Sequence, residues 1–426
     1  MNTMLRAVLT RMIKAGDLTV TDADGNRHQF GDKTGVPVHI RFNNRQAERA
    51  VVLDPELKVG ECFMDGDIDF VEGDVYSFLQ LVFENTGPTA ATEPWMKMIG
   101  RMRVLLRRFQ QMNTIARSSR NIKSHYDLSG ELYDLFLDPD KQYSCAYFDP
   151  PNATLAEAQL AKKRHIAAKL LVREGDKVLD IGCGWGGMGL YLARHLKANV
   201  TGVTLSEEQY GIANKRAEEE GLADRAKFLL TDYRSIHDRF DRLVSVGMFE
   251  HVGVGHFGEY FQHVARLLKP DGIFLLHSIG RADGPGATNP FIRKYIFPGG
   301  YIPALSEVLP HIEKAGLYVT DIEILRLHYA ETLKAWREAF IARRDEAKAL
   351  YDERFCRMWE FYLAASESAF RWQNMMVFHI QIAHRQDAVP LTRSYIEAEE
   401  KRLKRLDSAL RIANSEETAG KCSMQA

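Results

Sequence analysis

The sequence predicts an α/β protein in which a doubly wound, mostly parallel sheet follows a small N-terminal α+β domain. Strand-like apolar segments alternate with helical segments between about residues 154 and 278, and such alternation builds a parallel sheet with helices on both faces. A glycine-rich stretch, Gly182-Cys183-Gly184-Trp185-Gly186-Gly187, follows the first strand and opens a helix. Ligand-binding loops of Rossmann-like folds are built in this way.

Each element of the main domain is predicted from its own apolar pattern. Strands are expected at 178–181, 199–204, 226–230, 242–247 and 272–278, and helices at 154–171, 187–196, 206–220 and 258–268. In open sheets of this kind, ligands bind at the carboxyl ends of the strands. Polar residues fall at those ends: Asp180, Thr204, Asp232, Glu250 and His277. We therefore expect one ligand site along this edge of the sheet.

Residues 1–95 form a separate unit with its own apolar pattern. A helix is expected at 4–13, a hairpin at 17–30, a strand at 36–42 and a second helix at 74–85. This α+β module contains no catalytic constellation. A scaffold role and the binding of an apolar ligand, such as a lipid, are both compatible with it.

A basic segment at 96–120 follows a linker-like stretch at 87–94. From residue 96 to 124 there are eight basic residues and no acidic one, with apolar residues between them. A helix that is both basic and apolar suits an anionic membrane surface, where each cation contributes about 1 kcal/mol. A solvated linker and a nucleic-acid patch are the alternatives, and nothing else in the sequence indicates nucleic-acid binding.

The catalytic domain is expected to span 121–413. After Tyr329 the chain reads as helical and rich in aromatic residues, which we interpret as packing over the sheet edge. Residues 414–426 are expected to be a disordered tail.

The amino-acid composition indicates the general class of protein and its compartment. With 45% hydrophobic and 27% charged residues, the sequence is typical of a soluble globular protein. Five scattered cysteines indicate neither disulfides nor a zinc site, and no metal cluster is predicted. Because the first residues lack the features of a secretory signal and no apolar run reaches the roughly 18 residues of a membrane span, we expect a cytoplasmic protein.

Three details favour S-adenosylmethionine over a nicotinamide dinucleotide as the ligand of the glycine loop. Asp180 precedes the first glycine, where a carboxylate suits an ammonium group better than a pyrophosphate. The spacing is Gly-x-Gly-x-Gly, and not the Gly-x-Gly-x-x-Gly of dinucleotide sites. The strand at 199–204 ends without the acidic residue that holds the ribose in NAD proteins.

Five separated motifs together resemble the cyclopropane-fatty-acid synthase family. They are Tyr143-Ser144-Cys145-Ala146-Tyr147-Phe148, Asp180-Ile181-Gly182-Cys183-Gly184-Trp185-Gly186, Val203-Thr204-Leu205-Ser206, Gly247-Met248-Phe249-Glu250-His251-Val252-Gly253 and Tyr329-Ala330-Glu331-Thr332-Leu333. The resemblance runs from about residue 121 to 385, and the N-terminal unit is similar to a lipid-binding domain. It implies a class I methyltransferase fold, methylation of double bonds in membrane phospholipid, a homodimer, and peripheral association with the inner face of the cell membrane.

The implied reaction needs a positioned methyl donor, a dry pocket and a base. Aromatic faces can stabilise the carbocation that methylation leaves on the acyl chain, and the candidates are Tyr126, Tyr133, Phe136, Tyr147 and Phe249. The methyl group must then lose a proton to close the ring. In the family the base is a bound bicarbonate, and its holders map onto Cys145, Glu250, His277, the backbone of Ile279 and Tyr329.

The cofactor residues are expected around the glycine loop. Gly182 and Gly184 give close backbone approach, and Asp180 orders the methionine end. The resemblance adds Tyr143 and Ser144, with Thr204, Leu205 and Gln209 at the ribose, and Asp232 and Tyr233 near the adenine.

Four other functions remain open from the sequence. A hydride shift after methylation would give a methyl-branched or methylene fatty acid instead of a ring. An enzyme acting on carrier-linked chains, a non-catalytic lipid- or S-adenosylmethionine-binding protein and an NAD oxidoreductase are the others.

Overall fold

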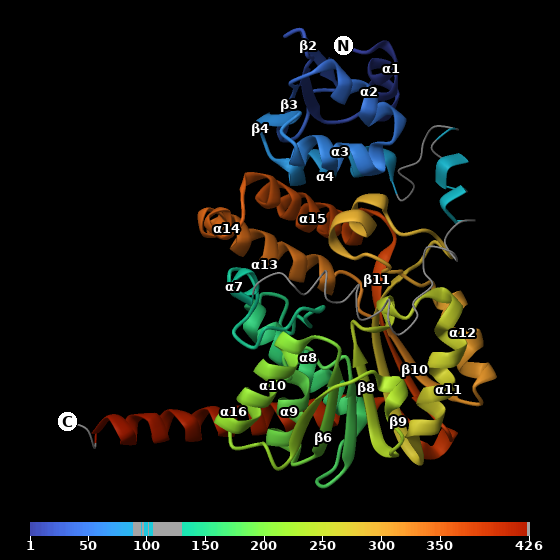
Figure 1. Ribbon diagram of the computed structural model, residues 1–426, viewed down its shortest axis with the longest axis vertical. Helices are drawn as coiled ribbons and strands as arrows, with labels where there is room; N and C mark the ends of the chain where they lie inside the picture. Colours follow the sequence, from blue (N-terminus) through green and yellow to red (C-terminus); the bar gives the residue numbers. More distant parts are fainter. Residues whose placement is uncertain (88–94, 96–97, 101, 105–129, 424–426) are drawn as a thin grey trace.

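The computed structural model describes residues 1–87, 95, 98–100, 102–104 and 130–423 of the chain (Figure 1). Its first part is the α+β unit that the sequence predicts. The helices are α1 (Thr3–Met12), α2 (Arg45–Leu53), α3 (Pro55–Met64) and α4 (Val75–Thr86), and the strands are β1 (Asp17–Thr21), β2 (Arg27–Phe30), β3 (Pro37–Phe42) and β4 (Ile68–Glu72). The strands form a sheet in the order β2-β1-β3-β4. The expected hairpin is confirmed as the antiparallel pair β1–β2.

The main domain is built on a sheet of seven strands in the order β10-β11-β9-β8-β5-β6-β7. The strands are β5 (Lys177–Ile181), β6 (Asn199–Thr204), β7 (Ala226–Leu230), β8 (Phe240–Val246), β9 (Leu268–Arg281), β10 (Tyr318–Ile324) and β11 (Met375–Ala383). Neighbours from β7 to β9 pair in parallel, whereas β11 runs antiparallel to both β9 and β10. The predicted mostly parallel sheet is confirmed.

Helices cover both faces of this sheet (Figure 1). One face carries α8 (Leu155–Leu170), α9 (Gly187–Leu196), α10 (Glu207–Glu219) and α16 (Ser394–Ser423), and the other carries α11 (Phe257–Leu267) and α12 (Leu305–Lys314). Short segments complete the connections: α7 (Gly130–Asp134), η1 (Tyr233–Ser235), η2 (Phe249–His251), η3 (Val254–His256), η4 (Ile292–Ile296) and η5 (Gln386–Ala388). α8 is buried almost throughout, because the sheet and α16 enclose it.

A group of three helices lies between the sheet and the N-terminal unit (Figure 1). They are α13 (His328–Ala342), α14 (Arg344–Leu350) and α15 (Glu353–Trp372). α15 packs against α3 and α4 of the N-terminal unit as well as against α13. The aromatic stripe after Tyr329 therefore fills this middle layer, and it also packs against Val377 of β11 and against Leu325, which follows the edge strand β10.

Two further predictions at the C-terminal end are corrected. Residues 375–383, expected within a helical segment, form β11, which is inserted between β9 and β10 and buried on both faces. An apolar run of this length does not separate a buried strand from a buried helix by periodicity alone. The tail expected to be disordered from residue 414 continues as helix α16 up to Ser423.

Most of the basic segment at 96–120, Tyr126 and the linker-like residues 88–94 lie outside the described residues. Within the described part, the guanidinium of Arg103 forms ion pairs with two carboxylates. It lies 2.7 Å from that of Asp54 and also pairs with that of Glu56. No helix among the described residues is both long enough and apolar enough to span a membrane.

Candidate active site

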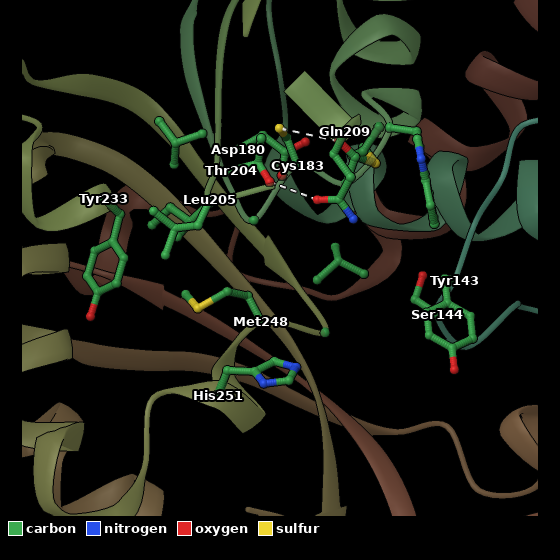
Figure 2. A pocket seen from close by; sticks show the side chains of 18 of the residues that line it. Tyr143, Ser144, Asp180, Cys183, Thr204, Leu205, Gln209, Tyr233, Met248 and His251 are labelled. Atoms are coloured by element: carbon green, nitrogen blue, oxygen red, sulfur yellow. Dashed lines mark hydrogen bonds between the residues drawn. The ribbon is translucent and has the colours of Figure 1, made fainter. Parts of the chain in front are cut away.

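All ten residues expected to bind a cofactor line one cavity at the carboxyl ends of β5, β6 and β7: Tyr143, Ser144, Asp180, Gly182, Gly184, Thr204, Leu205, Gln209, Asp232 and Tyr233. Gly182 has φ +80°, and a Cβ there would lie 2.7 Å from the Cβ of Met248. Glycine is therefore required at this turn for both its conformation and its size. In Figure 2, Tyr143 and Ser144 stand across the cavity from Tyr233 and Leu205, with Met248 and His251 between them.

Asp180 brings a buried carboxyl group to the cavity. It is 2% exposed, and its Oδ2 atom has no hydrogen-bond partner among the described residues. Burial raises the pKa of Asp180 to about 7, although the nearby Lys162 ammonium opposes the rise. An acceptor held without a protein partner is what the ammonium group of an amino-acid ligand requires.

Lys162 is a cavity residue that the sequence analysis missed. It projects from α8, is 1% exposed, and donates from Nζ to Oε1 of Gln142 at 2.6 Å and to Oγ of Ser144 at 2.8 Å. Burial lowers the pKa of Lys162 to about 8, against the opposing charge of Asp138. The sequence carries no local signal for it, because α8 is buried almost throughout and its charged residues are buried together with its apolar ones.

The expected ribose side is held together by a buried pair of side chains. Thr204 ends β6, and its hydroxyl donates to Oε1 of Gln209 at 2.7 Å (Figure 2). The same hydroxyl oxygen accepts the N–H of Ser206 at 3.2 Å, while the Ser206 side chain caps α10. Because the Gln209 carbonyl is occupied, its amide N–H₂ group is the part that is left to act as a donor.

The expected adenine side is a turn after β7. The carboxylate of Asp232 accepts from the backbone N–H of Arg234 at 2.9 Å and from its guanidinium at 2.7 and 2.8 Å. Burial raises the pKa of Asp232, but these bonds outweigh it and hold the pKa below its usual value. The ring of Tyr233 packs edge-on against Tyr260 and forms one wall.

The opposite wall is a cluster of aromatic rings from α7, the 142–148 loop, α13 and α15. The hydroxyl groups of Tyr143 and Tyr362 are 2.8 Å apart, and the Tyr143 ring stacks on Trp336. Of the rings expected to line a cation pocket, Tyr133 and Phe136 both contact Tyr143. The other two described candidates lie elsewhere: Tyr147 is stacked between His165 and His328, and Phe249 packs against Phe257 in the core.

The five residues expected to hold a base do not line the cavity, but lie directly behind its wall. Cys145 follows Ser144, Glu250 precedes His251, and His277 pairs with Val246 across β8 and β9. β9 runs three residues past the predicted end, so His277 and Ile279 lie inside the strand and share one face.

Glu250 and Ile279 are brought into direct contact. Oε1 of Glu250 accepts the backbone N–H of Ile279 at 2.6 Å, whereas Oε2 is buried without a partner in the described part of the chain. Burial raises the pKa of the Glu250 carboxyl to about 7, opposed by the bond from Ile279. The Ile279 N–H therefore positions Glu250, and in this structure it is engaged by that carboxylate instead of facing an anion.

The other three base-site residues are also buried. The Cys145 thiol donates to the carbonyl of Ala146 at 3.3 Å, and burial raises its pKa, which keeps it protonated. Nδ1 of His277 lies 2.7 Å from Nε2 of His379. Tyr329 is 8% exposed and packs against Trp336 and Phe370.

One cluster has the composition of a metal site, which the sequence analysis did not anticipate. One ligand atom each of His165, Glu323 and His379 lies within 4.8 Å of the others. However, Nζ of Lys169 donates to Glu323 and lies 3.1 Å from Nδ1 of His379. The positive charge at this position is therefore supplied by the protein itself.

The fold and the cavity define an S-adenosylmethionine-dependent methyltransferase of class I. A family model described as "Mycolic acid cyclopropane synthetase" matches residues 113–380, and one described as "Domain of unknown function (DUF7884)" matches residues 4–93. The chain belongs to the first of these families, and it is an enzyme of lipid modification.

Relatives match both halves of the chain. The cyclopropane-fatty-acyl-phospholipid synthase of Escherichia coli (strain K12) is 38% identical over 346 residues, which cover 81% of this chain and 87% of the relative. A probable fatty acid methyltransferase of Pseudomonas putida is 37% identical over 363 residues, covering 83% of this chain and 88% of the relative.

Two solved structures resemble the catalytic domain. The cyclopropane synthase MmaA2 of Mycobacterium tuberculosis has a TM-score of 0.60 at 34% identity and covers 62% of this chain and 98% of its own. The mycolic acid cyclopropane synthase CmaA1 complexed with SAH and CTAB has a TM-score of 0.60 at 34% identity, over 62% of this chain and 97% of its own.

Proposed function

We propose that this enzyme transfers the methyl group of S-adenosylmethionine to the cis double bond of an unsaturated acyl chain in membrane phospholipid, and that loss of a proton to bound bicarbonate then closes a cyclopropane ring. The observation that carries the proposal is the pairing of two features. A cofactor cavity lies against a separate buried cluster in which a carboxylate oxygen of Glu250 has no partner among the residues that the structure describes.

The cavity residues fit the cofactor by their chemistry. S-adenosylmethionine supplies an activated methyl group, and the protein has to bind and orient it. Asp180 offers the methionine ammonium group an acceptor that has no partner among the described residues, and the glycine loop allows close backbone approach. Gln209 offers an amide N–H₂ group on the ribose side, since its carbonyl is held by Thr204.

The buried cluster fits a small oxyanion that can carry a proton. Oε2 of Glu250 is an acceptor, and one ring nitrogen of His277 is a potential donor. The Cys145 thiol would donate to the oxyanion in place of the Ala146 carbonyl, and the Tyr329 hydroxyl is a further donor group. In the described part of the chain, the only hydrogen bond of the His277 side chain joins its Nδ1 to His379, so Nε2 is left for a ligand. Bicarbonate would be held by these groups and would supply the base.

The aromatic wall suits the intermediate of the reaction. The rings of Tyr143 and Trp185 line the cavity, and Tyr133, Phe136 and Trp336 are stacked or packed against them from behind. Such a wall excludes water and stabilises positive charge through its π-electrons. The acyl chain would therefore be methylated without capture of the cation by solvent.

The proposal also includes the oligomeric state and the binding of the protein to a membrane. We expect a homodimer that binds peripherally to the cytoplasmic face of an anionic membrane, with the basic segment at 96–120 and the N-terminal unit supplying the contact, and no nucleic-acid partner. Reversal of charge at Arg107 and Arg108 should weaken co-sedimentation with anionic vesicles. Vesicle binding by the unaltered protein that does not respond to salt would contradict this.

Bicarbonate dependence tests the proposed chemistry. The purified protein is incubated with unsaturated phosphatidylglycerol vesicles and S-adenosylmethionine in buffer freed of carbon dioxide, with and without added bicarbonate. We expect lipid methylation with ring closure to depend on the addition. Equal rates in both buffers would show that a protein residue is the base, and a methyl-branched or methylene product would favour the related C-methyltransferase function.

A further inference from the structure

A row of three ionisable side chains crosses the sheet behind the base site. His277 on β9 lies directly opposite His379 on β11, and His379 lies directly opposite Glu323 on β10. Directly paired residues of neighbouring strands point to the same face. α8 covers this face and adds His165 and Lys169, which are four residues apart and therefore on one side of the helix.

Hydrogen bonds connect this row into one chain. Nδ1 of His277 lies 2.7 Å from Nε2 of His379, and Nδ1 of His379 lies 3.1 Å from Nζ of Lys169. Lys169 also donates to Glu323, whose carboxylate is 2.7 Å from Nε2 of His165. His277, His379 and Lys169 are each at most 2% exposed, so these hydrogen bonds have no access to bulk water.

The direction of these hydrogen bonds follows from the chemistry of their ends. Burial lowers the pKa of Lys169, but the carboxylate of Glu323 favours the charged form of this lysine. An ammonium group has only donors, so Lys169 must donate to Nδ1 of His379. Burial and the lysine charges hold the pKa of His277 and of His379 well below the usual value, so both rings are neutral. Neutral His379 then carries its proton on Nε2 and donates to Nδ1 of His277.

We propose that Lys169 and His379 are positioning residues that fix His277 as the tautomer with its proton on Nε2, so that His277 offers one N–H to an oxyanion beside Glu250. This rests on the proposed function for the identity of the oxyanion. Without the two positioning residues, His277 would divide between two tautomers, and one of them would turn a lone pair toward the anion. A histidine partner that sets the tautomer of a functional histidine is a general device in enzyme sites.

The tautomer itself is measured by NMR. Long-range proton–nitrogen correlation spectra of the full-length protein, labelled with ¹⁵N at its 14 histidines, distinguish protonated from unprotonated ring nitrogens. The His277 signals are assigned by their loss in His277→Ala. We expect Nδ1 of His277 to be unprotonated and Nε2 protonated in the wild-type protein. A protonated Nδ1 would overturn the inference, whatever the activity of the enzyme.

Matched substitutions test the role of His379. In His379→Gln the side-chain amide can still donate to Nδ1 of His277, whereas His379→Leu removes the donor. We expect the leucine variant to lose the single tautomer and to lower kcat roughly 10- to 100-fold, with little change in S-adenosylmethionine affinity. The glutamine variant should restore the single tautomer and the wild-type kcat. His311→Leu on α12 is the control. Equal kcat in the leucine and wild-type proteins would overturn the inference.

Other outcomes separate the inference from the proposed function. If the leucine variant does not fold, Lys169→Met replaces it, and retention of a single Nε2–H tautomer there would count against the inference. If the wild-type tautomer is as expected but bicarbonate neither shifts the His277 signals nor affects turnover, the base-site function is wrong. The positioning of His277 would then still be supported.

Discussion

The backbone N–H of Ile279 donates to Oε1 of Glu250 at 2.6 Å, joining β9 to the short helix η2 that follows β8. This bond fixes one carboxylate oxygen and leaves the other, Oε2, buried with no partner among the described residues. An unsatisfied buried acceptor destabilises the protein by about 1–3 kcal/mol. A functional ligand that donates to Oε2 would relieve this cost.

Glu250→Gln should lower turnover and leave cofactor binding almost unchanged. The amide oxygen can still accept the Ile279 N–H, so the fold is preserved, while the acceptor at Oε2 is replaced by a donor. We expect a fall in kcat of roughly 100- to 10,000-fold and an S-adenosylmethionine Kd within about twofold of wild type, measured by calorimetry. The exposed Glu338→Gln on α13 is the control. Wild-type turnover in Glu250→Gln would show that this carboxylate is not part of the base site.

Turnover should rise with pH, with its midpoint near pH 7, and level off above it. The pKa of Glu250 is raised to about 7 by burial, and only the ionised carboxylate accepts hydrogen bonds through both oxygens. Because Asp180 has a similarly raised pKa, the profile of kcat is measured at saturating S-adenosylmethionine and fixed bicarbonate concentration. A flat profile between pH 6 and 8 would be inconsistent with this role for Glu250.

Lys162→Met should weaken S-adenosylmethionine binding. Lys162 holds Gln142 and Ser144 in place at the cavity wall and compensates the charge of Asp180. Loss of two charge-assisted hydrogen bonds is expected to raise the Kd at least about tenfold. Lys215→Met, on the exposed side of α10, is the matched control. An unchanged Kd in a folded Lys162→Met protein would exclude this role.

Asp180→Asn should stabilise the cofactor-free protein at neutral and higher pH. The folded-state pKa of Asp180 is raised from 3.8 to about 7, so wild-type stability falls as pH rises through this window and is constant above it. The asparagine variant lacks this loss and should gain up to about 4 kcal/mol relative to wild type by pH 8, with little difference below pH 4. Urea unfolding at several pH values measures the gain. A gain that does not depend on pH would mean that the carboxyl is not held protonated by the fold.

Local sequence patterns were sufficient for strands β5 to β9 and for the glycine loop, because each depends on a short segment with its own periodicity or spacing. Strand β10 was not predicted, and most of the expected cofactor residues came from the family resemblance. β11 was missed because an apolar strand buried on both faces shows no alternation. Lys162, Lys169, His165 and His379 were missed for a different reason: their burial depends on how α8 and β11 pack in three dimensions. A lysine in a charged helical run normally points to solvent, and the segment 161–165 carries no local sign that it does not.

The base-site residues were predicted from motifs, yet their arrangement was not. Spacing along the chain does not indicate that the Ile279 N–H is engaged by Glu250, or that His277 meets a second histidine across two antiparallel strands. Such contacts are set by strand register, which joins residues about 100 positions apart in the sequence.

Product analysis tests the central claim most directly. The protein is incubated with vesicles of unsaturated phospholipid and S-adenosylmethionine that carries a fully deuterated methyl group, and the fatty acids are analysed by gas chromatography and mass spectrometry. Ring closure predicts an acyl chain that has gained one carbon and kept two of the three deuterium atoms, with the retention time of a cyclopropane standard. A product that keeps all three deuterium atoms, or no label in lipid, would contradict the account.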